Sequence, residues 1–388
     1  MYNIKCSKKY VNYLEVASIE ERVSKLQLSN KKNIIYIKDV FDNSTFRYRT
    51  YNVMQAMENS DKYHINCFLE SEIKLIIPLL NKVSMIILQR CKWSFNLESF
   101  VTYVKSLNIK VCYDMDDLLY HPKYVPEYIE NIGNYDEFNI DVHFAVAGRY
   151  NQIAKQCDLF LVTTDSLKNY VENDFGKKAF IYPNFLNKEQ ESISDEIIST
   201  KESKRDSNKF YIGYFSGSNS HARDLGTVEP TLLQLMSKYD NIYLYIVGYM
   251  KLSDELEKLK DKGRVIIHPF VSYQELEYLI ASVDVNIIPL QKNAFNECKS
   301  ELKYFEASIV NTITIACNNS VYSKIIKDGE NGFLADDYEW YTKLENIYLN
   351  YDKMSNVISK AKKDCIEKYS CNNQKENLEK MFDKMIEM

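Results

Sequence analysis

Short apolar and β-branched runs recur along this chain, each separated from the next by a segment long enough for a helix. Short runs with apolar residues at consecutive positions fit strands that are buried on both faces of a parallel sheet. The first series is NIIYIKD (33–39), YHINCFL (63–69), VSMIILQ (83–89), IKVCYDMDD (109–117), DLFLVTTD (158–165) and KAFIYP (178–183). The second series is FYIGYF (210–215), NIYLYIVG (241–248), RVIIHPF (264–270), VDVNIIPL (283–290), NTITIAC (311–317) and NGFLA (331–335). The pattern predicts two successive α/β domains, each a doubly wound, Rossmann-like β/α/β fold.

A polar stretch separates the two series. Residues 187–209, NKEQESISDEIISTKESKRDSNK, are rich in Ser, Glu, Lys and Asp and poor in aromatic residues. This composition is typical of a solvated connection between domains, with room for one helical turn. We therefore expect an N-terminal domain over 1–186, a linker over 187–208 and a C-terminal domain over 209–369.

The end of the chain has helical periodicity from about residue 352 onward. We expect the segment 370–388 to form a helix that packs back toward the N-terminal domain. The positions predicted to be buried in this tail are Ile358, Cys365, Ile366, Leu378, Met381, Phe382 and Ile386.

Charge and cysteine content exclude several classes of protein. The formal net charge is -5, without long blocks of one sign, so the broad basic surface of a nucleic-acid-binding protein is not expected. The nine cysteines are scattered and include no C-x-x-C pair, which argues against a disulfide framework and a zinc site. The first residues lack the apolar core of a signal peptide, and the longest apolar runs are only strand-length. We expect a cytoplasmic protein without a membrane span.

Ligands of open α/β sheets bind beyond the carboxyl ends of the strands, so two facing sheets predict a site in the cleft between them. Residues Gly217 and Ser218 follow the first strand of the second domain, with His221 and Arg223 at the start of the next helix. A helix N-terminus with small residues and a guanidinium can bind phosphate. The alternative is an ordinary turn with Arg223 on the surface.

The stretch KSELKYFEASIV (299–310) supplies a second candidate. It predicts a helix with Lys299 and Ser300 in its first turn and Glu306 on the same face, about two turns later. A carboxylate at that place could accept two hydrogen bonds from vicinal hydroxyls such as those of a ribose. The alternative is a solvated helix face.

The order of these segments resembles the C-terminal domain of family-4 glycosyltransferases of the GT-B fold. That family carries a motif of Glu, seven residues and Glu-Ala on the helix, followed by a strand and the sequence DGENGFL. Here Glu306-Ala307, TITIAC and Asp328–Leu334 match, and the resemblance covers roughly residues 205–350. The N-terminal domain is similar more loosely, through STFRYRTYNVMQAM, YDMDDLLY and DLFLVTTDSLKNYV.

The resemblance implies a nucleotide-sugar donor, expected to be a UDP-sugar, bound by the second domain. It implies an acceptor on the first domain, a bacterial surface glycan, a lipid-linked sugar or a protein, and transfer with retention and without a metal or other cofactor. By analogy Glu306 binds the donor ribose and Arg223 and Lys299 contact the diphosphate, with help from Lys303. Contact with the membrane surface or with a partner glycosyltransferase is a further expectation.

One position departs from the family pattern. Cys298 stands where the first motif Glu is expected, and Glu301 is nominated as a catalytic carboxylate from a shifted loop, with Glu297 as a neighbour. This departure keeps open a second interpretation, a catalytically impaired subunit that binds nucleotide-sugar and supports a partner enzyme. A third, a sugar-nucleotide epimerase, lacks a visible acid–base set.

The sequence YDMDDLLY carries the remaining carboxylates. Asp114-x-Asp116 looks like the metal-binding D-x-D of GT-A enzymes, but that fold would leave the second β/α series unexplained. Asp116 and Asp117 are therefore interpreted as catalytic or acceptor-side carboxylates, with helix capping as the alternative.

Four further residues lie in segments that are expected near the cleft. Arg47 is a candidate source of positive charge in the first βα turn, whereas Arg49 is equally compatible with a surface ion pair. Asn184 resembles the family's residue at the end of the first domain, and His143 is interpreted as structural.

Overall fold

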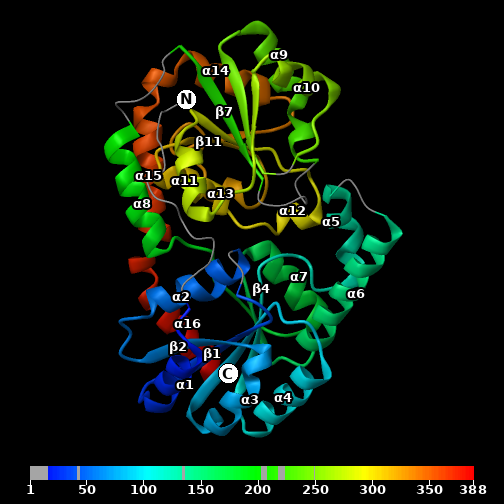
Figure 1. Cartoon of the computed structure of the whole chain (residues 1–388), viewed down its shortest axis with the longest axis vertical. Helices are drawn as coiled ribbons and strands as arrows, with labels where there is room; N and C mark the ends of the chain where they lie inside the picture. The colour runs from blue at the N-terminus through cyan, green and yellow to red at the C-terminus, as the bar shows by residue number, and fades with distance from the viewer. Residues whose placement is uncertain (1–15, 42–43, 133–135, 202–207, 217–222, 249) are drawn as a thin grey trace.

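The computed structural model describes residues 16–388 except 42–43, 133–135, 202–207, 217–222 and 249. Two α/β domains lie one above the other, each built on a six-stranded sheet (Figure 1). Every strand pairs in parallel with its neighbours. All of the strand-length runs in both predicted series form strands, so the prediction of two Rossmann-like domains is confirmed.

The first sheet has the order β2-β1-β3-β4-β5-β6. Its strands are β1 (Lys32–Lys38), β2 (Tyr63–Leu69), β3 (Val83–Gln89), β4 (Lys110–Met115), β5 (Leu159–Val162) and β6 (Ala179–Ile181). Its helices are α1 (Ile19–Leu28), η1 (Arg47–Tyr51), α2 (Asn52–Ala56), α3 (Ile73–Ile76), α4 (Phe95–Ser106), α5 (Val125–Ile132), α6 (Glu137–Ala154) and α7 (Asp165–Phe175). Helices α5 and α6 extend beside the sheet toward the second domain (Figure 1).

The second sheet has the order β12-β11-β10-β7-β8-β9. Its strands are β7 (Phe210–Phe215), β8 (Ile242–Val247), β9 (Val265–His268), β10 (Val285–Ile288), β11 (Ile313–Cys317) and β12 (Phe333–Ala335). Its helices are α9 (Glu229–Lys238), α10 (Asp254–Asp261), α11 (Tyr273–Ala281), α12 (Ala294–Glu297), α13 (Leu302–Ile309) and α14 (Trp340–Leu349).

The predicted linker differs from expectation, because most of it is helix α8 (Lys188–Lys201) rather than a solvated connection with one turn. Ile193 and Ile197 are buried at a spacing that places both on one helical face. The ammonium of Lys201 donates to two backbone carbonyls directly after α13. The polar composition hid a narrow apolar stripe that packs against the second domain.

The C-terminal segment crosses back to the first domain as predicted. Helix α15 (Ser355–Tyr369) packs against α13, and α16 (Lys375–Glu387) reaches the first sheet, where Asp383 accepts a hydrogen bond from the Tyr63 hydroxyl at 2.6 Å. Of the predicted core positions, Cys365, Leu378, Met381 and Phe382 are buried, Ile358 and Ile386 are partly buried, and Ile366 is exposed. Among the described residues, no helix combines the length and the apolar character needed to cross a bilayer.

Candidate active site

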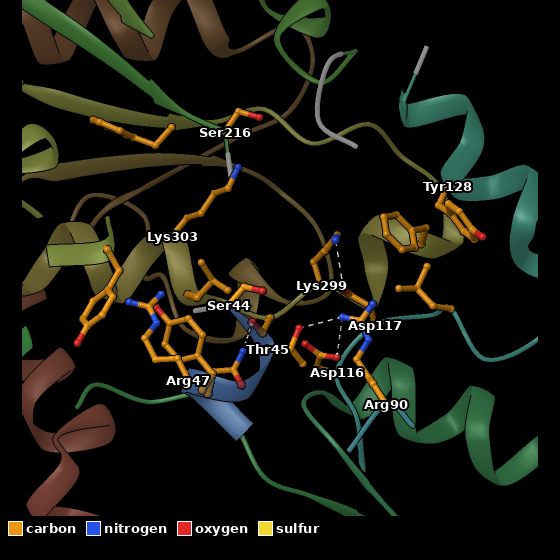
Figure 2. A pocket seen from close by; sticks show the side chains of 18 of the residues that line it. Ser44, Thr45, Arg47, Arg90, Asp116, Asp117, Tyr128, Ser216, Lys299 and Lys303 are labelled. Carbon is orange, nitrogen blue, oxygen red and sulfur yellow. Dashed lines mark hydrogen bonds and ion pairs between the residues drawn. The ribbon is translucent and has the colours of Figure 1, made fainter. Parts of the chain in front are cut away.

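A cavity of about 830 Å³ lies between the domains, lined by residues that follow the strands of both sheets (Figure 2). In the first sheet the strand order reverses between β1 and β3, and in the second between β7 and β10. Ligand sites of open α/β sheets form at such reversals. The cleft position predicted from the sequence therefore coincides with a cavity.

Arg90 is the first residue after β3 and one of the cavity's cations. Its φ of 48° lies in the left-handed region, which bulky side chains rarely adopt and which is concentrated at functional sites. Its guanidinium contacts Asp116 Oδ1 at 3.3 Å and Thr45 Oγ1 at 3.0 Å. Arg90 was not among the predicted site residues, although its place directly after a strand was a usable signal.

The two carboxylates of the Asp114-x-Asp116 pattern face different guanidinium groups. Asp114 is buried against Arg49 at 3.0 Å, whereas Asp116 faces Arg90. Burial raises the pKa of Asp114 to about 6, even though Arg49 opposes the shift. The proposed surface ion pair of Arg49 is therefore wrong, since this side chain is fully buried. Carboxylates already held by separate guanidinium groups do not form the paired ligand set of a D-x-D metal site.

Asp117 and Lys299 join the two domains by an ion pair at 3.2 Å (Figure 2). The Lys299 ammonium also lies 4.1 Å from the centre of the Phe295 ring. The predicted helical position of Lys299 and Ser300 is wrong, because α13 begins only at Leu302. Both residues lie in the loop between α12 and α13, and both line the cavity.

Glu306 lies on α13, buried at the floor of the cavity. Its carboxylate accepts a hydrogen bond from the Tyr48 hydroxyl and lies 3.6 Å from Arg47, so both of these contacts come from the first domain. Burial raises the pKa of Glu306, and Arg47 and the hydrogen bond from Tyr48 oppose that shift. The Nε and Nη1 atoms of Arg47 are buried and have no hydrogen-bond partner among the described residues.

Lys303 lies one turn before Glu306 and lines the same cavity. No carboxylate among the described residues forms an ion pair with it, and its ammonium lies 5.5 Å from the centre of the Tyr214 ring. Burial lowers the pKa of Lys303 to about 8. Figure 2 shows its side chain extending toward Ser216 at the end of β7. This end of the cavity therefore offers an unpaired positive charge beside a buried carboxylate.

The remaining predicted residues fall in three places. Gly217, Ser218 and His221 lie outside the described residues, and Arg223 is exposed and does not line the cavity. Ser300 lines the cavity and accepts a hydrogen bond from Asn184 at 2.9 Å.

Glu301 does not line the cavity, because its carboxylate turns toward the C-terminal tail. It accepts a hydrogen bond from the Tyr369 hydroxyl at 2.8 Å. Glu297 accepts from the backbone amide of Ser320 at 3.0 Å, and Cys298 is fully buried. The structure therefore brings neither carboxylate to the place that the shifted-loop interpretation required.

Residues 230–364 match the protein family described as "Glycosyl transferases group 1". A search of the curated proteins finds no match to this sequence. The matched segment begins in α9 and ends in α15, so it covers most of the second domain and none of the first.

Solved structures with similar folds extend the likeness to both domains. A glycosyltransferase from Rickettsia africae aligns with a TM-score of 0.62 and 15% identity, over 92% of this chain and 99% of that protein. HepE from Anabaena, in complex with UDP and glucose, aligns with a TM-score of 0.56 and 12% identity, over 91% of this chain and all of that protein. These likenesses show the fold, which is GT-B.

TarM from S. aureus, in complex with fondaparinux, alpha-GlcNAc-glycerol and UDP, aligns with a TM-score of 0.52 and 14% identity. The alignment covers 81% of this chain, which spans 58% of the TarM chain.

Proposed function

We propose that this protein is a retaining glycosyltransferase of family 4 that transfers a sugar from a UDP-sugar to a bacterial surface glycan or glycoprotein. The observation that carries the proposal is the unpaired Lys303 beside the buried Glu306, at the strand reversal of the second sheet. The match of residues 230–364 to a glycosyltransferase family and the UDP bound by HepE and TarM support it.

Each end of the bound donor has a distinct task in this proposal. Glu306 accepts hydrogen bonds from the ribose hydroxyls, which replace the hydroxyl of Tyr48. Lys303 faces the diphosphate, where negative charge develops as the bond to the sugar breaks, and a preorganised cation there stabilises the transition state. Lys299 lines the cavity and remains a predicted diphosphate contact, whereas Arg223 lies outside it.

The transfer is proposed to need no metal. Arg47 lines the same cavity, and its Nε and Nη1 atoms, which have no hydrogen-bond partner among the described residues, offer further donors. Asp116 and Asp117 face the cavity from the first domain and are proposed to contact the acceptor. No observation favours the impaired-subunit interpretation, whose support was Cys298.

A thermal-shift screen against UDP, GDP, ADP, CMP and dTDP tests the donor site, because a ligand that binds only the folded state raises its Tm. We expect UDP to raise the Tm of the wild type and of Glu257→Gln, a matched control on the exposed face of α10. Glu306→Gln should lose the shift relative to its own ligand-free Tm. No shift with any nucleotide, or an equal shift in Glu306→Gln, would contradict the proposal.

A further inference from the structure

One end of the cavity carries polar side chains that have no hydrogen-bond partner among the described residues. Tyr128 of α5 and His143 and Tyr150 of α6 line it, and none of the three has a hydrogen-bond partner for its side chain among the described residues. Burial lowers the pKa of His143, which keeps the imidazole neutral at pH 7. These groups can donate and accept hydrogen bonds without carrying charge.

Aromatic rings form the walls of the same end. The Tyr128 ring lies 5.6 Å from the Phe295 ring and 5.2 Å from the His143 ring, measured between centroids. Leu119, Val142 and Val146 complete an apolar surface. Sites for small organic ligands combine such walls with a few convergent polar groups.

The charges at this end are already paired. Arg90 forms an ion pair with Asp116 and Lys299 one with Asp117, whereas Lys303 at the opposite end forms no ion pair among the described residues. An acidic acceptor would therefore find no unpaired cation among the described residues here. The Oδ2 atom of Asp116 makes no contact with Arg90 and can accept a hydroxyl hydrogen bond.

We propose that the subsite formed by Tyr128, His143, Tyr150, Phe295 and Asp116 binds a neutral pyranose at the end of the acceptor. The apolar face of the ring packs on Tyr128 and Phe295, and its hydroxyls bond to His143, Tyr150 and the Asp116 carboxylate. The inference rests on the proposed function, because only a glycosyl-transfer reaction requires an acceptor as its second substrate.

The subsite is built from both domains. Tyr128, His143, Tyr150 and Asp116 belong to the first domain, whereas Phe295 lies on α12 of the second. The acceptor therefore meets a complete site only when the domains are apposed as they are here, with α5 against α12.

Saturation-transfer NMR on the full chain with UDP present tests the chemical class of the acceptor. The probes are the methyl glycosides of glucose, galactose and N-acetylglucosamine, together with glycerol 3-phosphate and a peptide rich in Ser and Thr. We expect signals from the ring protons of at least one glycoside and none from the other two probes. Binding of the phosphate or the peptide in place of every glycoside, or of no probe at all, would overturn the proposal.

Two variants locate the glycoside. Tyr150→Phe and His143→Ala remove groups that make no hydrogen bond among the described residues, so both should fold, and each should weaken glycoside binding by roughly tenfold. Tyr103→Phe, which changes an exposed tyrosine on α4, is the matched control. Unchanged glycoside affinity in both variants would overturn the subsite.

The UDP affinity of the same samples separates this proposal from the donor assignment. We expect the UDP Kd to stay within about twofold of the wild type in Tyr150→Phe and His143→Ala. If the wild type binds no UDP, the donor assignment fails, and the glycoside titration without nucleotide still decides the subsite.

Discussion

Lys303 is a cavity residue whose charge changes with pH just above neutrality. Burial lowers its pKa to about 8, so it is mostly protonated at pH 7 and mostly neutral at pH 9. The diphosphate of UDP attracts only the protonated form. Above pH 8 the protein must take up a proton to bind the ligand, and the UDP Kd should rise by up to tenfold per pH unit.

Isothermal titration of UDP between pH 7 and 9 measures this dependence. Lys303→Arg is the control, since a guanidinium stays protonated over the whole range. We expect a nearly constant Kd in Lys303→Arg. An equally steep rise in both proteins would show that another group titrates.

Prediction from the sequence succeeded for residues that belong to a motif or directly follow a strand. Glu306 and Lys303 were found through the helix pattern, and Asp116 and Asp117 through their place after a strand; all four line the cavity. Tyr128 was missed because it lies on a helix and reaches the cleft only through the packing of α5 against α12, which no local pattern encodes.

At the scale of elements, η1 is held against the first sheet by a buried ion pair. Arg49 on η1 lies 3.0 Å from Asp114 on β4, and both side chains are 1% exposed. The same turn of helix presents Arg47 and Tyr48 to the second domain. The ion pair therefore fixes the segment that contacts Glu306.

Arg49→Met should lower the free energy of unfolding by about 3–5 kcal/mol, because it leaves a buried carboxylate without its partner. The raised pKa of Asp114 means that the folded state binds more protons than the unfolded state between about pH 4 and 6. The contribution of this carboxyl to stability therefore falls as the pH rises through that range, so Arg49→Met should be less stable at pH 8 than at pH 5.

Chemical denaturation at the two pH values measures the effect. The double variant with Asp114→Asn should recover much of the loss, because the amide carries no charge. Lys238→Met, which breaks an exposed pair with Glu345, should change the stability little. A loss of that small size in Arg49→Met would contradict the account.

The predicted elements were correct for strands that are buried on both faces of a sheet. The prediction was less accurate for helices that bury only one face. Strands β2, β3 and β7 coincide with the predicted runs residue for residue, since consecutive apolar residues fit only a doubly covered strand. Helix α8 buries a stripe within a polar sequence, which composition alone conceals. The start of α13 was misplaced because Lys299 and Ser300 are compatible with a helix, and their loop conformation is set by contacts with the first domain.

At the scale of the whole molecule, small polar contacts join the two domains around the cavity. They include the Thr164 hydroxyl with the Cys298 carbonyl at 3.3 Å and Ser166 with Ser320 at 3.1 Å. Apolar contacts accompany them, because one buried apolar cluster includes residues of both domains. Tyr48 and Glu306 form another buried contact between the domains, at the carboxylate proposed to bind ribose.

Tyr48→Phe tests whether the first domain and the ligand compete for Glu306. Without the hydroxyl, the carboxylate is free to accept the ribose, and the UDP Kd should fall by about two- to tenfold, as measured by titration calorimetry. The control is Tyr51→Phe, which removes a hydroxyl bonded to Glu189 away from the cavity. Weaker UDP binding in Tyr48→Phe alone would show that this hydroxyl contacts the ligand.

The proposed reaction in the cleft breaks the bond between UDP and a sugar. Release of UDP from a panel of UDP-sugars, with the methyl glycosides as acceptors, measures this cleavage. We expect the wild type and Glu257→Gln to release UDP from at least one donor, and Glu306→Gln to release it about 100-fold more slowly. Folded wild-type protein that releases no UDP from any donor, or a Glu306→Gln variant as active as the wild type, would contradict the proposal.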